Sequence, residues 1–228
     1  MNHFLQIRNA TNPLLVHYTG EDLIRRGGMT EGTLELRLES RAERFDEDQL
    51  LVADAQKDVE AAAGLYDKYY AEVFRYVYHS TLDHAVAEDL TANVFLSAFR
   101  HLGRFEWRRI PFRAWLYRIA TNEIRMHYRR RRWASFTRFE PENGELPSEA
   151  PSAPECLAAR EEYRLVHRAL QELRLKYRTV IVLRYFEGKT IAEISDITRK
   201  REGTIKSQLH RGLARLQEIL GRWGVLPQ

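Results

Sequence analysis

The chain has 228 residues, of which 44% are hydrophobic and 30% are charged, with a formal net charge of +4. This composition excludes wholesale disorder, and apolar runs of about four residues are far too short for a membrane helix. The single cysteine, Cys156, excludes an internal disulfide framework and a cysteine zinc site. The first 25 residues lack the apolar stretch of a signal peptide, so we expect a cytoplasmic protein without membrane insertion.

The charges are distributed very unevenly along the chain. Residues 1–45 are balanced, whereas residues 46–94 carry eleven acidic residues against three basic ones. Residues 95–133 carry eleven arginines against two glutamates, and residues 199–228 carry seven basic residues against two acidic ones. Two basic zones separated by an acidic one predict two distinct contacts with a polyanion.

Prolines divide the chain. Four of the seven prolines lie within residues 141–154, among Glu, Ser, Ala, Asn and Gly, and residues 139–155 hold five glutamates and no basic residue. Such a segment cannot bury enough apolar surface to offset its ordering entropy, so residues 136–156 are predicted to be an extended acidic linker. This leaves domains at 46–135 and 157–228, preceded by an extension of unknown role at 1–45, within which Met29 is an alternative start.

Apolar residues recur every three or four positions in the first half. The stripes at 58–78, 85–102 and 112–128 predict three helices, and Pro111 stands where the third helix could begin.

The second half has the same helical period. We expect a helix near 165–173, another near 180–187 that ends at Gly188, a short one at 191–197 and a long one ending near 220. No segment alternates with period two, so the predicted fold is all-α: two small helical domains joined by the linker.

The last two predicted helices form a helix-turn-helix pattern, with a short helix at 190–197, a break at 198–200 and a longer helix at 201–220. The N-terminal residues of such a second helix can reach base edges in the major groove, and later basic residues can reach phosphates. A solvated basic surface is the alternative explanation. The candidate contacts with duplex DNA are Lys200, Arg201, Thr204, Lys206, Ser207, Gln208, Arg211 and Arg215.

A second basic zone surrounds the 112–128 helix. Arg129-Arg130-Arg131-Arg132-Trp133 follows it, and Trp107, Trp115 and Trp133 could offer stacking surfaces for unpaired bases. Alternatively, Trp115 belongs to the core because it lies on the apolar stripe, and the arginines form a solvated helix end. The combination of eleven arginines, three tryptophans and the 104–111 loop favours nucleic acid.

These residues resemble a known family. The segments Asp46 to Gln49, Ala87-Glu88-Asp89-Leu90, Val94-Phe95-Leu96 and Phe112 to Ala120 with Asn122 are similar to sigma region two. Glu187-Gly188, Ile194, Gly203 to Ser207 and Leu209-His210-Arg211 are similar to sigma region four. The chain thus resembles a bacterial RNA polymerase sigma factor of the extracytoplasmic-function group in the sigma-70 family.

The resemblance implies roles for particular residues. It implies contact with the polymerase clamp through Asp89, Leu90, Asn93 and Phe95, and contact of region four with the polymerase flap and the minus-thirty-five duplex. Asp89 and Phe95 are six residues apart and nearly opposite on a helix, so Phe95 either packs inward or lines a hydrophobic contact while Asp89 faces the clamp. It implies capture of the melted minus-ten strand through Arg104, Trp107, Arg108, Arg109, Trp115, Arg118, Asn122, Arg125, Arg129 and Arg130. It further implies a linker in the polymerase cleft, core RNA polymerase and promoter DNA as partners with a possible anti-sigma factor, no cofactor or metal, and no catalytic activity.

The chain also departs from the family pattern. Ala92 and Asn93 stand where the family usually has Gln and Glu, Met126 replaces an Asp, and Gln208 replaces a common Arg. In the helix-turn-helix, Arg199 and Lys200 replace a glycine and an apolar residue. Because a positive φ is costly for arginine, we expect the turn to shift, with Thr198 as a helix cap.

Two other classes of function remain open at this point. A polymerase-independent regulator with a similar C-terminal helix-turn-helix would bind duplex DNA alone and would not need the Trp- and Arg-rich zone. An enzyme would need more than His84, Glu88 and His79, because no third ligand is spaced for a metal site and no phosphate-binding loop or nucleophile motif is present.

Overall fold

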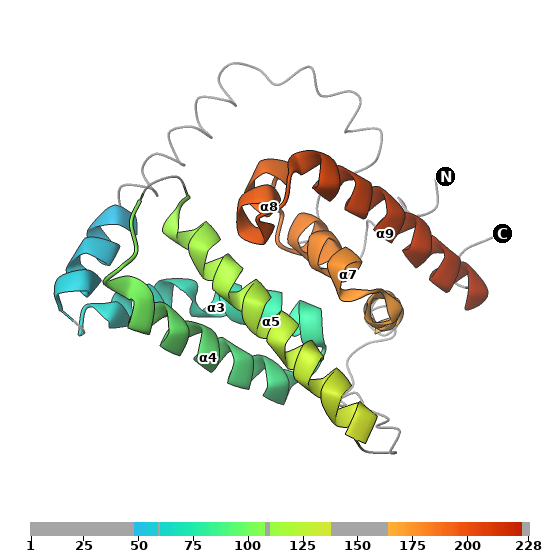
Figure 1. The fold of residues 1–228 in the computed structure, drawn as a ribbon, viewed down its shortest axis with the longest axis horizontal. Helices are drawn as coiled ribbons and strands as arrows, with labels where there is room; N and C mark the ends of the chain where they lie inside the picture. The colour runs from blue at the N-terminus through green and yellow to red at the C-terminus, as the bar shows by residue number, and fades with distance from the viewer. Residues whose placement is uncertain (1–47, 59, 108–109, 138–163, 225–228) are drawn as a thin grey trace, which may run out of the picture.

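The computed structural model describes residues 48–58, 60–107, 110–137 and 164–224, and its regular structure in these ranges is entirely helical, which confirms the all-α prediction (Figure 1). A helix at 48–57 precedes α3 (Ala62–Thr81), α4 (His84–Leu102) and α5 (Phe112–Thr137). After a helix at 164–172 come α7 (Leu175–Ile181), the π-helix η2 (Val182–Phe186), α8 (Ile191–Thr198) and α9 (Glu202–Arg222). We call residues 48–137 the N-terminal unit and residues 164–224 the C-terminal unit.

The N-terminal unit is a bundle in which α3 packs against α4 and α5. The α3 helix ends at Leu82, which adopts a left-handed conformation and donates its N–H to the Tyr78 carbonyl. Directly after it, the Asp83 side chain accepts a hydrogen bond from the Val86 N–H at 3.0 Å and caps α4. The core of the unit includes Leu65, Tyr69, Val73, Val94, Ala98 and Leu116. The predicted stripes of α4 and α5 face this core, whereas in α3 the buried face is one residue away from the predicted stripe through Tyr66, Tyr70 and Phe74.

Two features of this unit differ from the sequence prediction. The α5 helix continues to Thr137, nine residues beyond the predicted end, because arginine is a good helix former and the basic run carries no helix breaker. The helix at 48–57 was not predicted. It buries Val52 and Ala55, and its Gln56 donates to the carbonyls of Leu102 and Phe105.

The second predicted helix of the C-terminal unit consists of two parts. The α7 helix widens into η2, where the Glu187 N–H bonds to the carbonyl of Val182, five residues back. Gly188 then reverses the chain at a φ of 63°, a value that favours glycine. As a result Glu187 and Lys189 both lie buried at the surface that faces the N-terminal unit.

The turn between α8 and α9 does not shift, contrary to our expectation. Arg199 adopts the left-handed conformation itself, at a φ of 56°, and its N–H bonds to the Ser195 carbonyl. Thr198 closes α8 rather than capping the next helix, since its hydroxyl donates to the Ile194 carbonyl. The Lys200 N–H also reaches the Ser195 carbonyl, and the Ser195 hydroxyl donates to the Lys200 carbonyl at 2.5 Å. Backbone bonds therefore hold a standard tight turn without its usual glycine.

The two units pack against each other. Figure 1 shows α5 crossing the molecule, with α4 on one side and α7 and α8 on the other, and the closest contacts join α5 to α8 and α3 to η2. The predicted linker (136–156) and N-terminal extension (1–45) fall almost entirely outside the described residues. Among the described helices, none is both long and apolar enough to cross a membrane.

Candidate nucleic-acid and polymerase interfaces

The N-terminal half of α9 presents a polar, cationic surface to solvent. Its apolar residues Ile205, Leu209 and Leu216 are buried, so the intervening positions must point outward. The exposed candidates are Arg201, Thr204, Lys206, Ser207, Arg211 and Arg215. Arg215 is paired with Glu218 at 2.5 Å, which neutralises part of its charge, whereas Lys206 and Arg211 have no ion pair among those found in the described part of the chain.

Lys200 and Gln208 lie differently from the other predicted contacts with duplex DNA. Both are half-buried at the turn, and the Lys200 ammonium donates to the Gln208 side-chain oxygen at 3.1 Å. Burial lowers the pKa of Lys200, and the nearby charges of Arg125 and Lys176 lower it further. This pair ties α9 to the turn, so we no longer assign Gln208 to direct base reading. No local pattern indicates this pair, because Lys200 and Gln208 are eight positions apart on either side of the turn.

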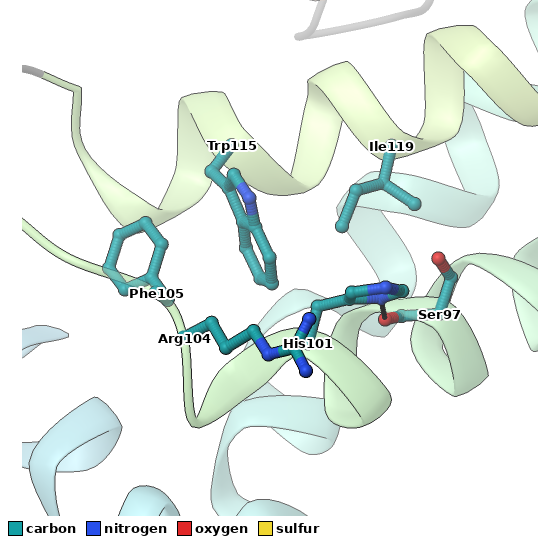
Figure 2. Close-up of a pocket in the computed structure, with 6 residues that line it drawn as sticks. All are labelled: Ser97, His101, Arg104, Phe105, Trp115 and Ile119. Carbon is teal, nitrogen blue, oxygen red and sulfur yellow. Dashed lines mark hydrogen bonds between the residues drawn. The ribbon is translucent and has the colours of Figure 1, made fainter.

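A shallow open pocket of about 240 Å³ lies between the end of α4 and the start of α5 (Figure 2). Trp115 and Ile119 extend from α5 toward His101 and Ser97 on α4, and the His101 ring is hydrogen-bonded to the Ser97 carbonyl at 2.8 Å. Arg104 and Phe105 complete the lining. The pocket thus combines aromatic surface with a cationic rim, which suits the planar face of a base and its phosphate.

The tryptophans divide into three environments. Trp115 is half-buried and packs its ring 4.9 Å from that of Phe105, so it serves the core and the pocket at once. Trp107 packs edge-on against Phe105 at 5.2 Å, also half-buried. Trp133, by contrast, is 75% exposed on the far part of α5. Arg108 and Arg109 lie outside the described residues.

The α5 helix carries the remaining candidates for the unpaired strand. Arg129 and Arg130 are exposed, Asn122 is exposed, and Arg125 lies 3.4 Å from the Asn122 side-chain oxygen. Arg118 is the exception because α8 covers it in part: its guanidinium donates to the Asp196 carbonyl at 2.5 Å. Burial and the nearby Arg199 lower the pKa of Arg118.

The residues assigned to the polymerase clamp are on two different faces of α4. Asp89 and Asn93 are exposed, but Leu90 and Phe95 are buried, and Phe95 packs its ring 4.8 Å from that of Tyr66. Leu90 and Phe95 therefore belong to the core, and their assignment as contact residues is corrected. The sequence assignment missed Leu96, which is 53% exposed beside Asn93. The sequence signal that could have identified Leu96 is its position as an apolar residue outside the buried stripe of α4.

The described histidines are not grouped as a metal site would require. His84 and Glu88 are an exposed pair one helical turn apart, at 3.5 Å, and no group of three potential ligands occurs in the part of the chain that the structure describes.

Comparison with known proteins shows which protein families this chain is similar to. The model of sigma-70 region 2 matches residues 65–134, and that of sigma-70 region 4 matches residues 163–216. The sigma factor SigL of Mycobacterium tuberculosis is 32% identical over 161 residues, which are 71% of this chain and 89% of that protein. BldN of Streptomyces coelicolor is 33% identical over 175 residues, which are 75% of this chain but only 64% of the relative.

The chain belongs to the extracytoplasmic-function group of the sigma-70 family of RNA polymerase sigma factors. It is accordingly a factor for promoter-specific transcription initiation with RNA polymerase. The match to region two also argues against the polymerase-independent regulator, which has no need of that part.

Solved structures support the fold. CnrH, in complex with the cytosolic domain of CnrY, gives a TM-score of 0.57 at 24% identity and covers 77% of this chain and 97% of that one. RpoE from Bartonella quintana, in complex with the anti-sigma factor NepR, gives 0.55 at 24% identity over 70% and 96%.

Proposed function

We propose that this sigma factor recognises a promoter at two places, using α9 for the minus-thirty-five duplex and the α4–α5 surface for the melted minus-ten strand. Lys206 and Ser207 would face the major groove, with Arg211 and Arg215 on phosphates. Arg104, Asn122, Arg125 and Arg129 would contact the unpaired strand. The observation that carries the proposal is the difference in form between these two cationic surfaces.

A single helix suits a duplex, and a pocket suits a base. The exposed face of α9 is a regular convex surface that matches the width of a major groove. The α4–α5 pocket instead offers an aromatic wall from Trp115 and Phe105 beside the Arg104 cation. Such a site can stack only on a base that has left the helical stack, because the faces of a base within a duplex are covered by its neighbours.

The polymerase contacts would lie on other faces. Asp89, Asn93 and Leu96 on the outer surface of α4 are proposed for the clamp, and α9 also for the flap. In this role the chain supplies binding and no chemistry, and it acts where the polymerase acts, in the cytoplasm. An anti-sigma factor is a proposed further partner, since both solved relatives described above are complexes with such a protein or with CnrY.

The test is transcription from a promoter library by core polymerase with and without the purified chain. We expect new start sites that depend on the chain, and no strong binding to duplex DNA in a gel shift without polymerase. Unchanged RNA output and start sites would contradict the proposal, and strong binding to duplex alone would favour a polymerase-independent regulator.

The division of labour can be tested on a promoter with a pre-opened bubble. Arg211→Ala should weaken open-complex formation on closed and bubble templates alike, because upstream duplex is present in both. Asn122→Ala should be rescued by the bubble only if Asn122 assists melting, and should remain defective if it reads the unpaired strand. If neither variant affects open-complex formation, the two-surface assignment is wrong.

A further inference from the structure

His101 is a residue of the α4–α5 pocket that the sequence did not predict as part of a site. It lies in the last turn of α4, and its side chain is exposed. Figure 2 shows its ring beside Ser97 and Arg104, across from Trp115 and Ile119 of α5. An imidazole is therefore part of the surface that we propose for the unpaired strand.

A hydrogen bond within α4 determines which ring nitrogen of His101 carries a proton. The Nδ1 atom lies 2.8 Å from the Ser97 carbonyl oxygen, and because a carbonyl can only accept, Nδ1 must be the donor. In the neutral ring the second nitrogen, Nε2, then keeps its lone pair and is an acceptor. The two ring nitrogens point in divergent directions, so the bond from Nδ1 back to the helix directs Nε2 away from the backbone of α4. The end of α4 thus offers an oriented hydrogen-bond acceptor.

The other polar side chains of the pocket have a different hydrogen-bonding capacity. The Arg104 guanidinium and the Trp115 indole N–H can only donate, and the Ser97 hydroxyl can donate or accept. The two remaining lining side chains are apolar. Among the six side chains that line the pocket, His101 is therefore the one whose available polar atom is restricted to accepting.

An acceptor beside a cationic donor distinguishes the four bases. Adenine and cytosine each carry an exocyclic amine next to a ring nitrogen that accepts, which matches this pair of groups. Guanine and thymine have a carbonyl oxygen in place of the amine, and that oxygen would face the lone pair of His101 Nε2. A base that leaves such groups without a partner binds less tightly than one that satisfies them.

We infer that His101 is a specificity-determining residue, whose Nε2 accepts a hydrogen bond from the exocyclic amine of an adenine or a cytosine in the unpaired strand. In this arrangement Trp115 stacks on the face of the base, and Arg104 donates to the ring nitrogen beside the amine. The inference rests on the proposed capture of an unpaired base by this pocket. It adds a choice among bases, which stacking alone does not provide because every base has a planar face.

The test uses holoenzyme, formed from core polymerase and the full-length chain, on promoter templates with a pre-opened bubble. Abasic sites, placed one at a time in the unpaired strand, identify the positions whose base contributes to binding. At each of these positions adenine and cytosine are compared with guanine and thymine. They are also compared with purine and 2-pyrimidinone, which lack only the amine. Binding is measured at about pH 8, where an imidazole is neutral.

Two substitutions at opposite ends of α4 are compared with the wild type. His101→Phe keeps an aromatic ring but has no acceptor. His84→Phe is the matched control, because His84 is an exposed histidine in the first turn of the same helix, away from the pocket. Since both histidines are exposed, neither substitution should unfold the protein.

We expect the wild type and His84→Phe to prefer adenine or cytosine at one position, and to bind about three- to tenfold more weakly when the amine is removed. His101→Phe should bind the amino base and its amine-free analogue equally well at that position. Equal losses in the wild type and His101→Phe at every position, or no effect of the amine in the wild type, would overturn the inference while leaving the pocket's proposed function intact. If no abasic site weakens binding, the proposed capture of unpaired bases itself fails.

Discussion

Replacing Arg199 by glycine should stabilise the protein. Arg199 has a φ of 56°, where a side chain's Cβ costs about 1–2 kcal/mol relative to the right-handed region. Glycine removes this cost. Its greater conformational freedom in the unfolded chain, however, lowers the free energy of unfolding by about 0.5–1 kcal/mol. We therefore expect a net increase of about 1 kcal/mol in the free energy of unfolding. For a protein of this size, that is a rise of about 2–4 °C in the melting temperature.

Arg199→Ala separates the backbone effect from the charge effect. Arg199 lies close enough to lower the pKa of Arg118, so removing its charge relieves some repulsion in either variant. Alanine retains the Cβ and the strain, and only glycine removes both. Urea and thermal unfolding at neutral pH would measure the two variants in parallel. Equal stabilisation by alanine and glycine would refute the argument from backbone strain, and so would a glycine variant less stable than wild type.

Three further predictions concern other parts of the molecule. Gly212→Leu should destabilise the C-terminal unit by about 1–3 kcal/mol in urea unfolding, because a Cβ there would lie 3.0 Å from Ile181 and 3.2 Å from Tyr177; Gly221→Ala, with open space around it, should not. Burial, and the charge of Arg75, lower the pKa of His79 to about 4, and burial beside His79 lowers that of His167 to about 3. Since the unfolded chain then binds more protons, unfolding free energy should fall as pH drops from about 6.5 toward 4, and His79→Gln should flatten that slope. Arg211→Ala should reduce the salt dependence of promoter binding by about 0.9 in the log–log slope, and Arg215→Ala by less because Glu218 already pairs with it; equal slopes would contradict this.

Periodicity was sufficient to predict most of the fold. The stripes that predicted α4, α8 and α9 consist of apolar residues at helical spacing, and most of those residues are buried. In α3 the period was right but the buried face was not, because Leu65, Tyr69 and Val73 are buried while Tyr66 is 38% exposed. The helix at 48–57 escaped because Val52 and Ala55 are too few to mark a period. The π-helix could not be predicted, because widening the hydrogen-bond register by one residue leaves the composition of the segment unchanged.

The candidate sites were predictable only in part. Helical spacing correctly separates the exposed Lys206 and Arg211 from the buried Leu209. Family resemblance, however, does not indicate which face of α4 points inward, and so it placed Leu90 among the clamp contacts although that side chain is buried. The bond between Glu72 and Lys189 joins residues 117 positions apart. No local pattern specifies such a pair, because it depends on how two separately folded units meet.

The π-helix makes the interdomain contact sensitive to chain length. An α-helix turns by about 100° per residue, and a π-turn is in effect a helix with one residue inserted. Deleting a single residue within Val182–Phe186 would let α7 continue as an α-helix and rotate Glu187 and Lys189 away from α3. Both side chains would still be present, yet neither would meet its partner. A related chain one residue shorter at this position would therefore lose the bonds of Glu187 and Lys189 to α3 even if it retained every charged residue that forms them.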